Sequence, residues 1–415
     1  MIVVLIISDM VLFSCTKETV SIATTTGATS TTTPSVDGIS ATLASVRQYT
    51  VDNQVTSATA ALFYNMYASA KTSVMVGQQE AYLHGYGMAD GYRTTSDMYL
   101  GCGKDPAING SDFMFITSKM NTAGSWWQQQ ETQIVEAVKS SYAKGIINTF
   151  CWHYYEPYDG NSFYANGINA DTLLLDFPSI LPGGVNHKSF TQSLRKIASI
   201  ANELTDANGQ PIPFIFRPFH ECNGNWFWWG APYCTPAQYK QGYQFVVTYL
   251  RDSLNVHTIL YEYSPNDYDS SPYASITSST TYFDRYPGDA YVDIVGFDGY
   301  NDVAQGASGA SALAAKLQFI SNYAGTHHKI AALAETGFQF PSSSAPSSFF
   351  TSALYAGYST SGAHIGYMMF WYNTQTAYYV PTSVCPEVTD FKNFVGNSSV
   401  LLNGQTGNMF TFPTK

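Results

Sequence analysis

The sequence predicts a (β/α)₈ TIM barrel, an α/β fold that forms one catalytic domain. Three observations predict this fold. Eight short apolar segments recur between residues 73 and 372, and helix-like segments with polar faces lie between them. Most of the apolar segments are continuous, as in parallel strands that are covered on both faces. A chain of 415 residues is also long enough for one large barrel domain.

The predicted strands are 73–78, 107–116, 145–153, 212–220, 258–264, 292–298, 329–335 and 365–372. The predicted helices include 125–143, 187–205, 236–254 and 310–324. Segment 187–205 illustrates the helical pattern, with apolar residues at helical spacing: Phe190, Leu194, Ile197 and Ile200. Strands that alternate with helices in this way indicate repeated β/α units.

Polar and aromatic residues gather at the ends of the predicted strands. Seven of the eight ends carry them, namely GQQE, CWHYYEPY, RPFHECNG, YEYSPND, GFDGY, AETG and FWYN. The strand bodies lack such residues. Barrel enzymes place their chemistry at the carboxyl ends of the strands. The pattern therefore predicts an active site at that end of the barrel.

Two carboxylates stand out among these strand ends. Glu221 and Glu335 each close an apolar run, at the fourth and seventh predicted strands. Glycosidic-bond hydrolysis needs one carboxylic acid to protonate the leaving oxygen and a second carboxylate at the anomeric carbon. A single Glu is usually a solvated loop residue, but a carboxylate in aromatic surroundings is costly, which favours a functional pair. Burial would also raise the pKa of one of the two.

The composition agrees with a neutral, hydroxyl-rich ligand. Charged residues make up 12% of the chain, about half the usual share. Aromatic residues make up 15%, and their rings can stack on sugars; a large, poorly charged core is the alternative explanation. The net charge is −11 and there is no long basic run, which excludes nucleic acid as an expected partner.

The N-terminal region predicts export. Residues 1–15 fit a signal peptide, and LFSC at their end resembles a bacterial lipobox in which Cys15 is lipidated. Because no Lys or Arg precedes the apolar run and Asp9 interrupts it, an ordinary secretory signal is the alternative. We expect a lipoprotein at the outer membrane or cell surface, or a secreted protein. Residues 16–45 are predicted to be a disordered Thr/Ser-rich linker, and 46–415 the catalytic domain. Membrane contact would be through the lipid anchor alone.

The cysteines indicate no metal site. After Cys15, five remain: Cys102, Cys151, Cys222, Cys234 and Cys385. Cys222 and Cys234 bracket a Trp-rich segment and are a candidate disulfide, which the sequence leaves open. No pair of cysteines has metal-site spacing. We expect no metal and no cofactor, and a monomer.

Several segments together resemble glycoside hydrolase family 26, whose best-known members are β-mannanases. They are RPFHECNGNWFWWG at 217–230, a YYEPY-type aromatic loop, YSPND, PGDAYVDIVGFDGY and AALAETG. The resemblance covers roughly residues 55–375. It implies a (β/α)₈ barrel with a retaining double displacement, and hence an endo-β-1,4-mannanase that acts on mannan, glucomannan or galactomannan.

The resemblance also implies roles for individual residues. Glu221 matches the acid/base, Glu335 the nucleophile, and His220 the histidine that contacts the nucleophile. The residues that match the subsite of the cleaved sugar are His153, Trp226, Tyr300 and Trp371. Arg217 and Asp298 match supporting positions. From chemistry alone, Trp226 and Trp371 offer stacking faces, and Tyr300 can donate a hydrogen bond to the nucleophile.

Two positions depart from the family pattern. Cys222 stands where members often carry Met, and Tyr372 stands where some mannanases carry Arg. Chain-length preference and endo action are therefore open. The alternatives are a β-1,3-xylanase or mixed-linkage β-glucanase of the same family, and a surface glycan-binding lipoprotein without catalysis.

Overall fold

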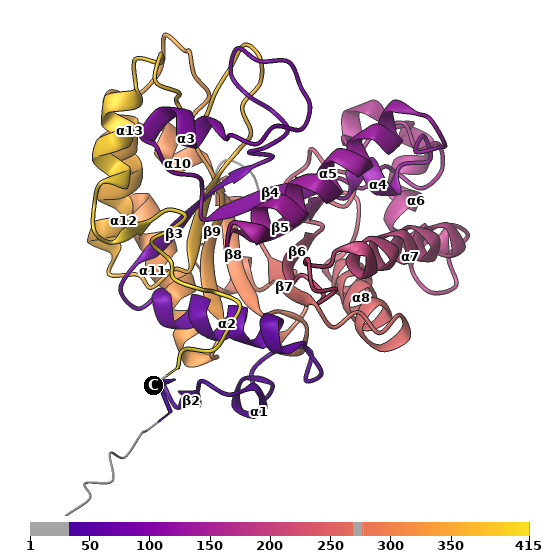
Figure 1. Cartoon of the computed structure of the whole chain (residues 1–415). Coiled ribbons are helices and arrows are strands. Elements are labelled where there is room, and N and C mark those ends of the chain that lie inside the picture. The colour runs from indigo at the N-terminus through magenta and orange to yellow at the C-terminus, as the bar shows by residue number, and fades with distance from the viewer. Residues whose placement is uncertain (1–32, 269–275, 277, 415) are drawn as a thin grey trace, which may run out of the picture. The chain divides into compact units, whose positions relative to one another are not determined.

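The computed structural model describes residues 33–268, 276 and 278–414, and it confirms the predicted barrel. Eight parallel strands, β3 to β10, pair in chain order, and β10 pairs with β3 to close the sheet (Figure 1). The strands are β3 Val74–Gln79, β4 Ile108–Asp112, β5 Ile147–Trp152, β6 Phe214–Pro218, β7 Ile259–Tyr263, β8 Ile294–Gly299, β9 Ile330–Thr336 and β10 Tyr367–Phe370.

Helices surround the barrel, and the four helices predicted above are present. They are α5 Trp126–Ala143, α7 His187–Glu203, α8 Pro236–Thr248 and α11 Ala310–Thr326. Helix α8 starts at a capping box formed by Thr235 and Gln238 and continues into a π-helical turn. The other α-helices of the barrel are α3 Asp97–Cys102, α4 Met114–Thr117, α6 Ala170–Ile180, α9 Ser279–Tyr282, α10 Asn301–Ala304, α12 Ala356–Ser361 and α13 Val388–Val395. Among the described residues, no helix is both long and apolar enough to cross a bilayer.

Helix α2, Ser57–Ser69, closes the amino-terminal end of the barrel (Figure 1). Its Phe63 and Met66 belong to one buried cluster with Ile215 of β6 and Leu260 of β7. Since alternate strand residues face the same side, Arg217 points into the barrel two residues above Ile215. Apolar side chains thus fill the floor of the barrel, and polar ones remain at its carboxyl end.

The predicted domain boundary at residue 46 is wrong. Residues 33–45 fold onto the barrel as a two-stranded ribbon and the start of a short helix: β1 Ser35–Val36, β2 Ile39–Ser40 and α1 Leu43–Val46. Ile39 and Val46 are fully buried in the cluster at the barrel floor. Ile39 supplies apolar surface that the preceding Thr/Ser-rich stretch lacks. The expected signal peptide 1–15, with Cys15, and the tether as far as residue 32 lie outside the described residues.

The predicted strand 107–116 is also too long. Strand β4 ends at Asp112, and the apolar residues that follow form helix α4. Phe115 and Ile116 are buried there. A short apolar run does not distinguish a buried strand from a buried helix, so the sequence pattern merged the two elements. Besides β1 and β2, the structure has a further strand that was not predicted, β11 Val400–Leu401, which pairs in parallel with β3.

Candidate active site

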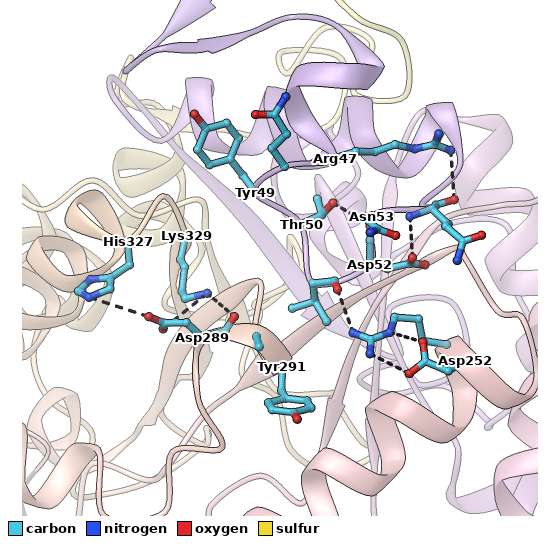
Figure 2. Close-up of a pocket in the computed structure, with 15 residues that line it drawn as sticks. Arg47, Tyr49, Thr50, Asp52, Asn53, Asp252, Asp289, Tyr291, His327 and Lys329 are labelled. Atoms are coloured by element: carbon cyan, nitrogen blue, oxygen red, sulfur yellow. Dashed lines mark hydrogen bonds and ion pairs between the residues drawn. The ribbon is translucent and has the colours of Figure 1, made fainter.

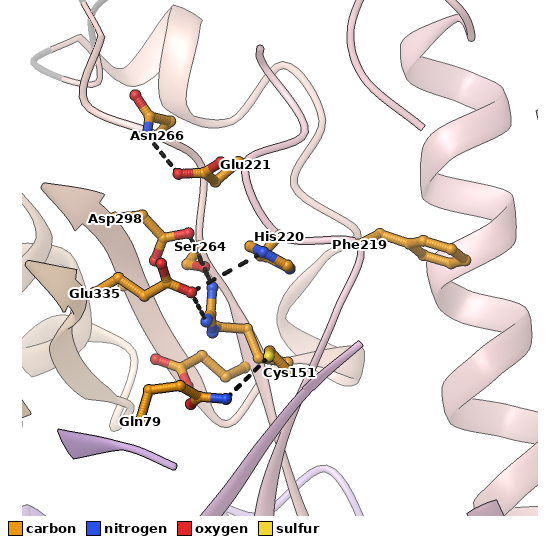
Figure 3. Close-up of polar contacts among 12 residues, drawn as sticks. Gln79, Cys151, Phe219, His220, Glu221, Ser264, Asn266, Asp298 and Glu335 are labelled. Carbon is orange, nitrogen blue, oxygen red and sulfur yellow. Dashed lines mark hydrogen bonds and ion pairs between the residues drawn. The ribbon is translucent and has the colours of Figure 1, made fainter. Parts of the chain in front are cut away.

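The chain leaves β6 through a sharp turn that presents two of the predicted residues. Phe219 and Glu221 both have φ near 53°, a conformation that is uncommon for residues with a side chain. The turn sends the Phe219 ring outward, away from the polar group (Figure 3). His220 and Glu221 face the carboxyl end of the barrel, where the side chain of Arg217 also lies.

A bulge in β9 turns Glu335 into the barrel. Phe297 of β8 pairs with Leu333, whereas Asp298 pairs with Glu335, so Ala334 is an extra residue in β9. Without the extra residue, Glu335 would point to the same side as Leu333, which packs against the outer helices. The bulge instead places the Glu335 carboxylate beside Asp298 (Figure 3).

Arg217 lies between these two carboxylates and is almost fully buried. Its Nη1 donates to Oδ2 of Asp298 at 2.9 Å and to Oγ of Ser264 at 3.1 Å. Its Nη2 donates to Oε1 of Glu335. A guanidinium in this position supplies positive charge to both carboxylates, where little water screens it.

Two further predicted residues approach Glu335. The Tyr300 hydroxyl donates to Oε2 of Glu335 at 2.9 Å, as the sequence predicted. Nε2 of His220 lies 4.0 Å from Oε1 of Glu335. Burial, together with the charges of Arg217 and His153, lowers the pKa of His220 well below its usual value, so its imidazole is neutral.

Glu221 has a different environment. Its carboxyl accepts hydrogen bonds from Nδ2 of Asn266 at 2.6 Å and from Nε1 of Trp226. Burial and the nearby charge of Glu335 raise the pKa of Glu221 to about 7, against the opposing effect of these two hydrogen bonds. One carboxyl is therefore protonated up to neutral pH beside a second one that is paired with Arg217.

The carboxyl groups are close together. One oxygen from each of Glu221, Asp298 and Glu335 lies within 4.8 Å of the others. Retaining glycosidases hold their two carboxyls about 5–5.5 Å apart, whereas inverting enzymes leave roughly 6.5–9.5 Å for a water molecule. The spacing fits the retaining geometry. Three carboxylates can also hold a metal ion, but Arg217 already supplies the positive charge to two of them.

His153 enters the site from the end of β5, held by Asp112 at the end of β4. Oδ2 of Asp112 lies 2.6 Å from Nδ1 of His153, and its Oδ1 accepts the backbone N–H of His153 at 3.1 Å. Burial opposes the charged imidazole, but the Asp112 carboxylate outweighs this and raises the pKa of His153. The His153 ring lies 4.6 Å from the ring of His220 and 5.9 Å from that of Trp371.

Sequence reasoning missed Asp112 because strand 107–116 was drawn four residues too long. Because β4 ends at Asp112, the one strand end that lacked polar residues in the prediction is polar as well. Asn266 was also missed, although it lies in the YSPND segment that carried the resemblance. Both polar residues stand at or near a strand end, which is a signal in the sequence. Their contacts with His153 and Glu221 cannot be seen from the sequence.

The aromatic residues after Glu221 divide into two groups. The ring of Trp226 lies against Gly224, where a Cβ would come within 2.4 Å of it, so only glycine fits. The other three rings are buried: Phe227, Trp228 and Trp229. Nε1 of Trp229 donates to the carbonyl of His220 at 2.7 Å and braces the turn that carries the site. These rings therefore pack the loop.

The candidate disulfide is not formed. The five cysteines that the structure describes are free thiols, and four of them are buried. The Sγ atom of Cys222 faces the Tyr263 hydroxyl at 3.6 Å, while that of Cys234 faces the carbonyl of Trp229 at 3.4 Å.

A separate open hollow of about 770 Å³ lies at the opposite end of the barrel (Figure 2). It is lined by residues that precede β7, β8 and β9 and by the segment before α2. Its charged side chains pair with one another, for example Lys329 with Asp289 and Arg251 with Asp252. None of the predicted site residues lies in it.

Comparisons with known proteins agree with this geometry. Residues 51–349 match glycosyl hydrolase family 26. The chain is 33% identical to the mannan endo-1,4-beta-mannosidase of Bifidobacterium adolescentis over 291 residues, which cover 69% of this chain and 27% of that protein. It is 29% identical to the Bacillus subtilis enzyme of the same name, over 58% of this chain and 62% of that protein. The chain thus spans less than two thirds of the length of both relatives.

Solved structures of similar proteins also superpose on this chain. The structure of GH26C from a Muricauda species superposes with a TM-score of 0.86 and 39% identity, over 92% of this chain and all of that one. A double mutant of the endo-beta-1,4-mannanase of Cellulomonas fimi superposes with a TM-score of 0.78 and 28% identity, over 87% of this chain and 79% of that one.

Proposed function

Because the chain belongs to glycosyl hydrolase family 26, we propose that it is a retaining endo-β-1,4-mannanase that hydrolyses mannan, glucomannan and galactomannan. The observation that carries the proposal is the pair Glu221 and Glu335, close together in opposite electrostatic environments. The substrate class follows the names of the similar proteins, and the reaction follows from the geometry.

In the first step, Glu335 attacks the anomeric carbon while Glu221 gives its proton to the leaving glycosidic oxygen. The C–O bond to the leaving sugar breaks, and an ester forms between the sugar and Glu335. Tyr300 and Arg217 hold the Glu335 carboxylate in place before attack. Trp226 and Asn266 hold Glu221 where it can reach the leaving oxygen.

In the second step, Glu221 takes a proton from water, which attacks the anomeric carbon and releases Glu335. The change of role has a physical cause in this site. The charge of Glu335 is one of the two effects that raise the pKa of Glu221. Formation of the ester removes that charge, so Glu221 becomes a stronger acid and remains ionised, ready to act as a base.

The substrate assignment is tested with a panel of glycans. The purified protein is incubated with linear mannohexaose, galactomannan, β-1,3-xylan and lichenan, and products are followed by reducing ends and chromatography. We expect internal cleavage of mannohexaose and galactomannan. Cleavage of xylan or lichenan without cleavage of mannan would contradict the mannanase assignment. Binding to mannan without cleavage would instead support a non-catalytic glycan-binding protein.

We also propose that the protein is exported as a monomer and held at the outer membrane or cell surface by lipid on Cys15. The support is the apolar run that ends in LFSC. Labelling cells with a radioactive fatty acid tests this. Label on the native protein that is lost in Cys15→Ala is expected; an unlabelled protein in the medium would identify an ordinary secretory signal. Light scattering of the purified protein tests the monomer.

A further inference from the structure

A buried carboxylate joins the two loops that support the carboxyls of the proposed reaction. The loop after β7 carries Asn266, whose Nδ2 donates to Glu221 (Figure 3). The loop after β8 carries Tyr300, whose hydroxyl donates to Glu335. Asp267 follows Asn266 in the chain and is fully buried. Its side chain extends to the loop after β8. One buried residue therefore contacts the supports of both carboxyls.

The Asp267 carboxylate binds the backbone of the loop after β8. Its Oδ1 accepts the N–H groups of Tyr300 and Asn301, each at 3.1 Å, and its Oδ2 accepts that of Asp302 at 3.3 Å. A carboxylate that accepts three successive N–H groups fixes the path of this segment. Since Tyr300 begins the segment, these contacts also determine where its hydroxyl meets Glu335.

The backbone of Asp267 is fixed as well. Its N–H donates to the carbonyl of Asp298 at 2.9 Å, and the N–H of Asp298 donates to the carbonyl of Pro265 at 2.9 Å. These two bonds align the loop after β7 with the end of β8, where Asn266 pairs with Asp298. Because Asn266 lies inside this aligned segment, a shift of Asp267 would move the amide that donates to Glu221.

Lys316 of α11 supplies positive charge to this group and is almost fully buried. Its Nζ donates to the backbone carbonyl of Asp267 at 2.9 Å and lies 3.7 Å from Oδ2 of Asp267. It also lies 2.9 Å from Oδ2 of Asp302. Burial raises the pKa of Asp267 to about 6, against the opposing effect of Lys316 and the N–H of Asn301. Loss of Lys316 would leave two buried carboxylates near each other, which is costly.

We propose that Asp267 and Lys316 are positioning residues for both carboxyls of the reaction. Asp267 acts on the acid through Asn266 and on the nucleophile through Tyr300, and Lys316 holds Asp267 in place. The proposal rests on the proposed glycosidase function. The effect on the acid has a definite sign. The hydrogen bond from Asn266 lowers the pKa of Glu221, so a weaker bond leaves this pKa higher.

The first test measures kcat and the pH profile of kcat/KM in Asp267→Asn and Lys316→Met. Displacement of Tyr300 should lower kcat about tenfold, since a hydrogen bond to a charged group is worth about this much. A weaker contact from Asn266 should move the alkaline limb, which follows Glu221, to higher pH. A native kcat together with a native limb in the folded variants would overturn the proposal.

Two buried residues at the opposite end of the barrel provide matched controls. Asp293 precedes β8, and its carboxylate accepts the N–H groups of Val51 at 2.7 Å and Tyr261 at 2.8 Å. Lys329 precedes β9, and its Nζ donates to the carbonyl of Asp289 at 2.9 Å. Asp293→Asn and Lys329→Met should lower stability but leave kcat and the alkaline limb native. Equal changes of kcat and limb in these controls would contradict a positioning role.

Double-mutant cycles separate positioning from a general structural role. If Asp267 acts through Tyr300, Asp267→Asn should lower kcat much less in a Tyr300→Phe background than in the native protein. If it acts through Asn266, the shift of the alkaline limb should be smaller in an Asn266→Ala background. Additive effects in both backgrounds would contradict the proposal. Thermal unfolding identifies variants that do not fold; if Lys316→Met is one of them, Asp267→Asn decides, because it keeps the shape of the side chain.

A failure of the proposed function is recognised separately. The kinetic tests use whichever glycan of the panel the native protein cleaves. If it cleaves none, the proposed function is wrong, and the positioning role is tested without turnover. An NMR titration of the Glu221 carboxyl carbon then compares the native protein with Asp267→Asn. A higher pKa of Glu221 in the variant is expected, and an unchanged pKa would overturn the proposal.

Discussion

Asp112 holds His153 through two hydrogen bonds, one to the ring at 2.6 Å and one to the backbone at 3.1 Å. Asp112 is buried, and the ring of His153 lies 4.6 Å from the ring of His220. The contact with Asp112 orients the His153 ring through its Nδ1. It also brings β4 into the active site, although this strand end looked apolar in the sequence.

The contact predicts the effect of Asp112→Asn. The amide retains the shape of the carboxylate but removes its charge, so the pKa of His153 should fall. We expect kcat/KM for mannohexaose to fall about tenfold or more, since a hydrogen bond to a charged group is lost. Histidine ring signals followed by NMR across a pH titration report the pKa. An unshifted titration with native activity would show that Asp112 has no such role.

The environment of Glu221 predicts the alkaline limb of the pH profile. Glu221 must be protonated for the first step, and its pKa is raised to about 7. Activity, measured as kcat/KM, should therefore be lost as the pH rises through about 7. Trp226→Phe removes a hydrogen bond that lowers this pKa, so the limb should move to higher pH. A limb that stays in place in this variant would argue against Glu221 as the acid.

The hydrogen bond from Tyr300 to Glu335 predicts that Tyr300→Phe loses activity without unfolding. Removal of one donor to the nucleophile should lower kcat about 10-fold to 100-fold. Steady-state kinetics on mannohexaose measure the loss. Tyr291→Phe, in the hollow at the other end of the barrel, is the control and should retain native kcat. Equal losses of kcat in both variants would show that the effect is not specific to the hydrogen bond from Tyr300 to Glu335.

The packing of the Trp-rich loop predicts a stability difference. The Trp228 side chain is fully buried, whereas 54% of Trp126 is exposed. Trp228→Ala should lower the free energy of unfolding by about 3–5 kcal/mol, and Trp126→Ala by no more than roughly 0.5 kcal/mol. Urea unfolding measured by fluorescence gives both values. Similar losses in the two variants would mean that Trp228 does not anchor the loop.

The free thiols predict the behaviour of Cys222 and Cys234 under non-reducing conditions. After unfolding without reductant, iodoacetamide should alkylate both residues, and peptide mass spectrometry should find no cross-linked pair. The two thiols have different partners: Nη1 of Arg285 lies 3.3 Å from Sγ of Cys234, and Sγ of Cys222 lies 3.6 Å from the Tyr263 hydroxyl. A cross-linked peptide would contradict the described arrangement.

The sequence predicted the fold well because a barrel repeats the same signal eight times. Each barrel strand is buried on both faces, so it is a continuous apolar run. It can be recognised without knowing which residues face the barrel interior and which face the helices. The boundaries were less predictable. The apolar pattern did not separate the end of β4 at Asp112 from the apolar helix α4 that follows. Residues 33–45 resembled a linker in composition, although Ile39 is buried.

The site was predictable in its residue types but not in its contacts. Glu335 is brought inward by a one-residue bulge, and no period in the sequence marks the extra Ala334. Asp112 and His153 lie at the ends of different strands, and Tyr372, whose ring packs against His84, lies in a different loop from His84, so the spacing of these pairs in the sequence carries no signal. The turn at Phe219 and Glu221 involves only neighbouring residues. It was still not predictable, because non-glycine residues with positive φ have no reliable sequence pattern.

The central claim is that Glu335 forms a covalent bond to the sugar while Glu221 serves as acid and base. The most direct measurement traps this intermediate with a 2-deoxy-2-fluoro-β-mannosyl donor that has a good leaving group, and then maps the modified peptide by mass spectrometry. We predict one sugar per protein, on Glu335. Label on Glu221 or Asp298, or release of a product with inverted anomeric configuration, would contradict the account.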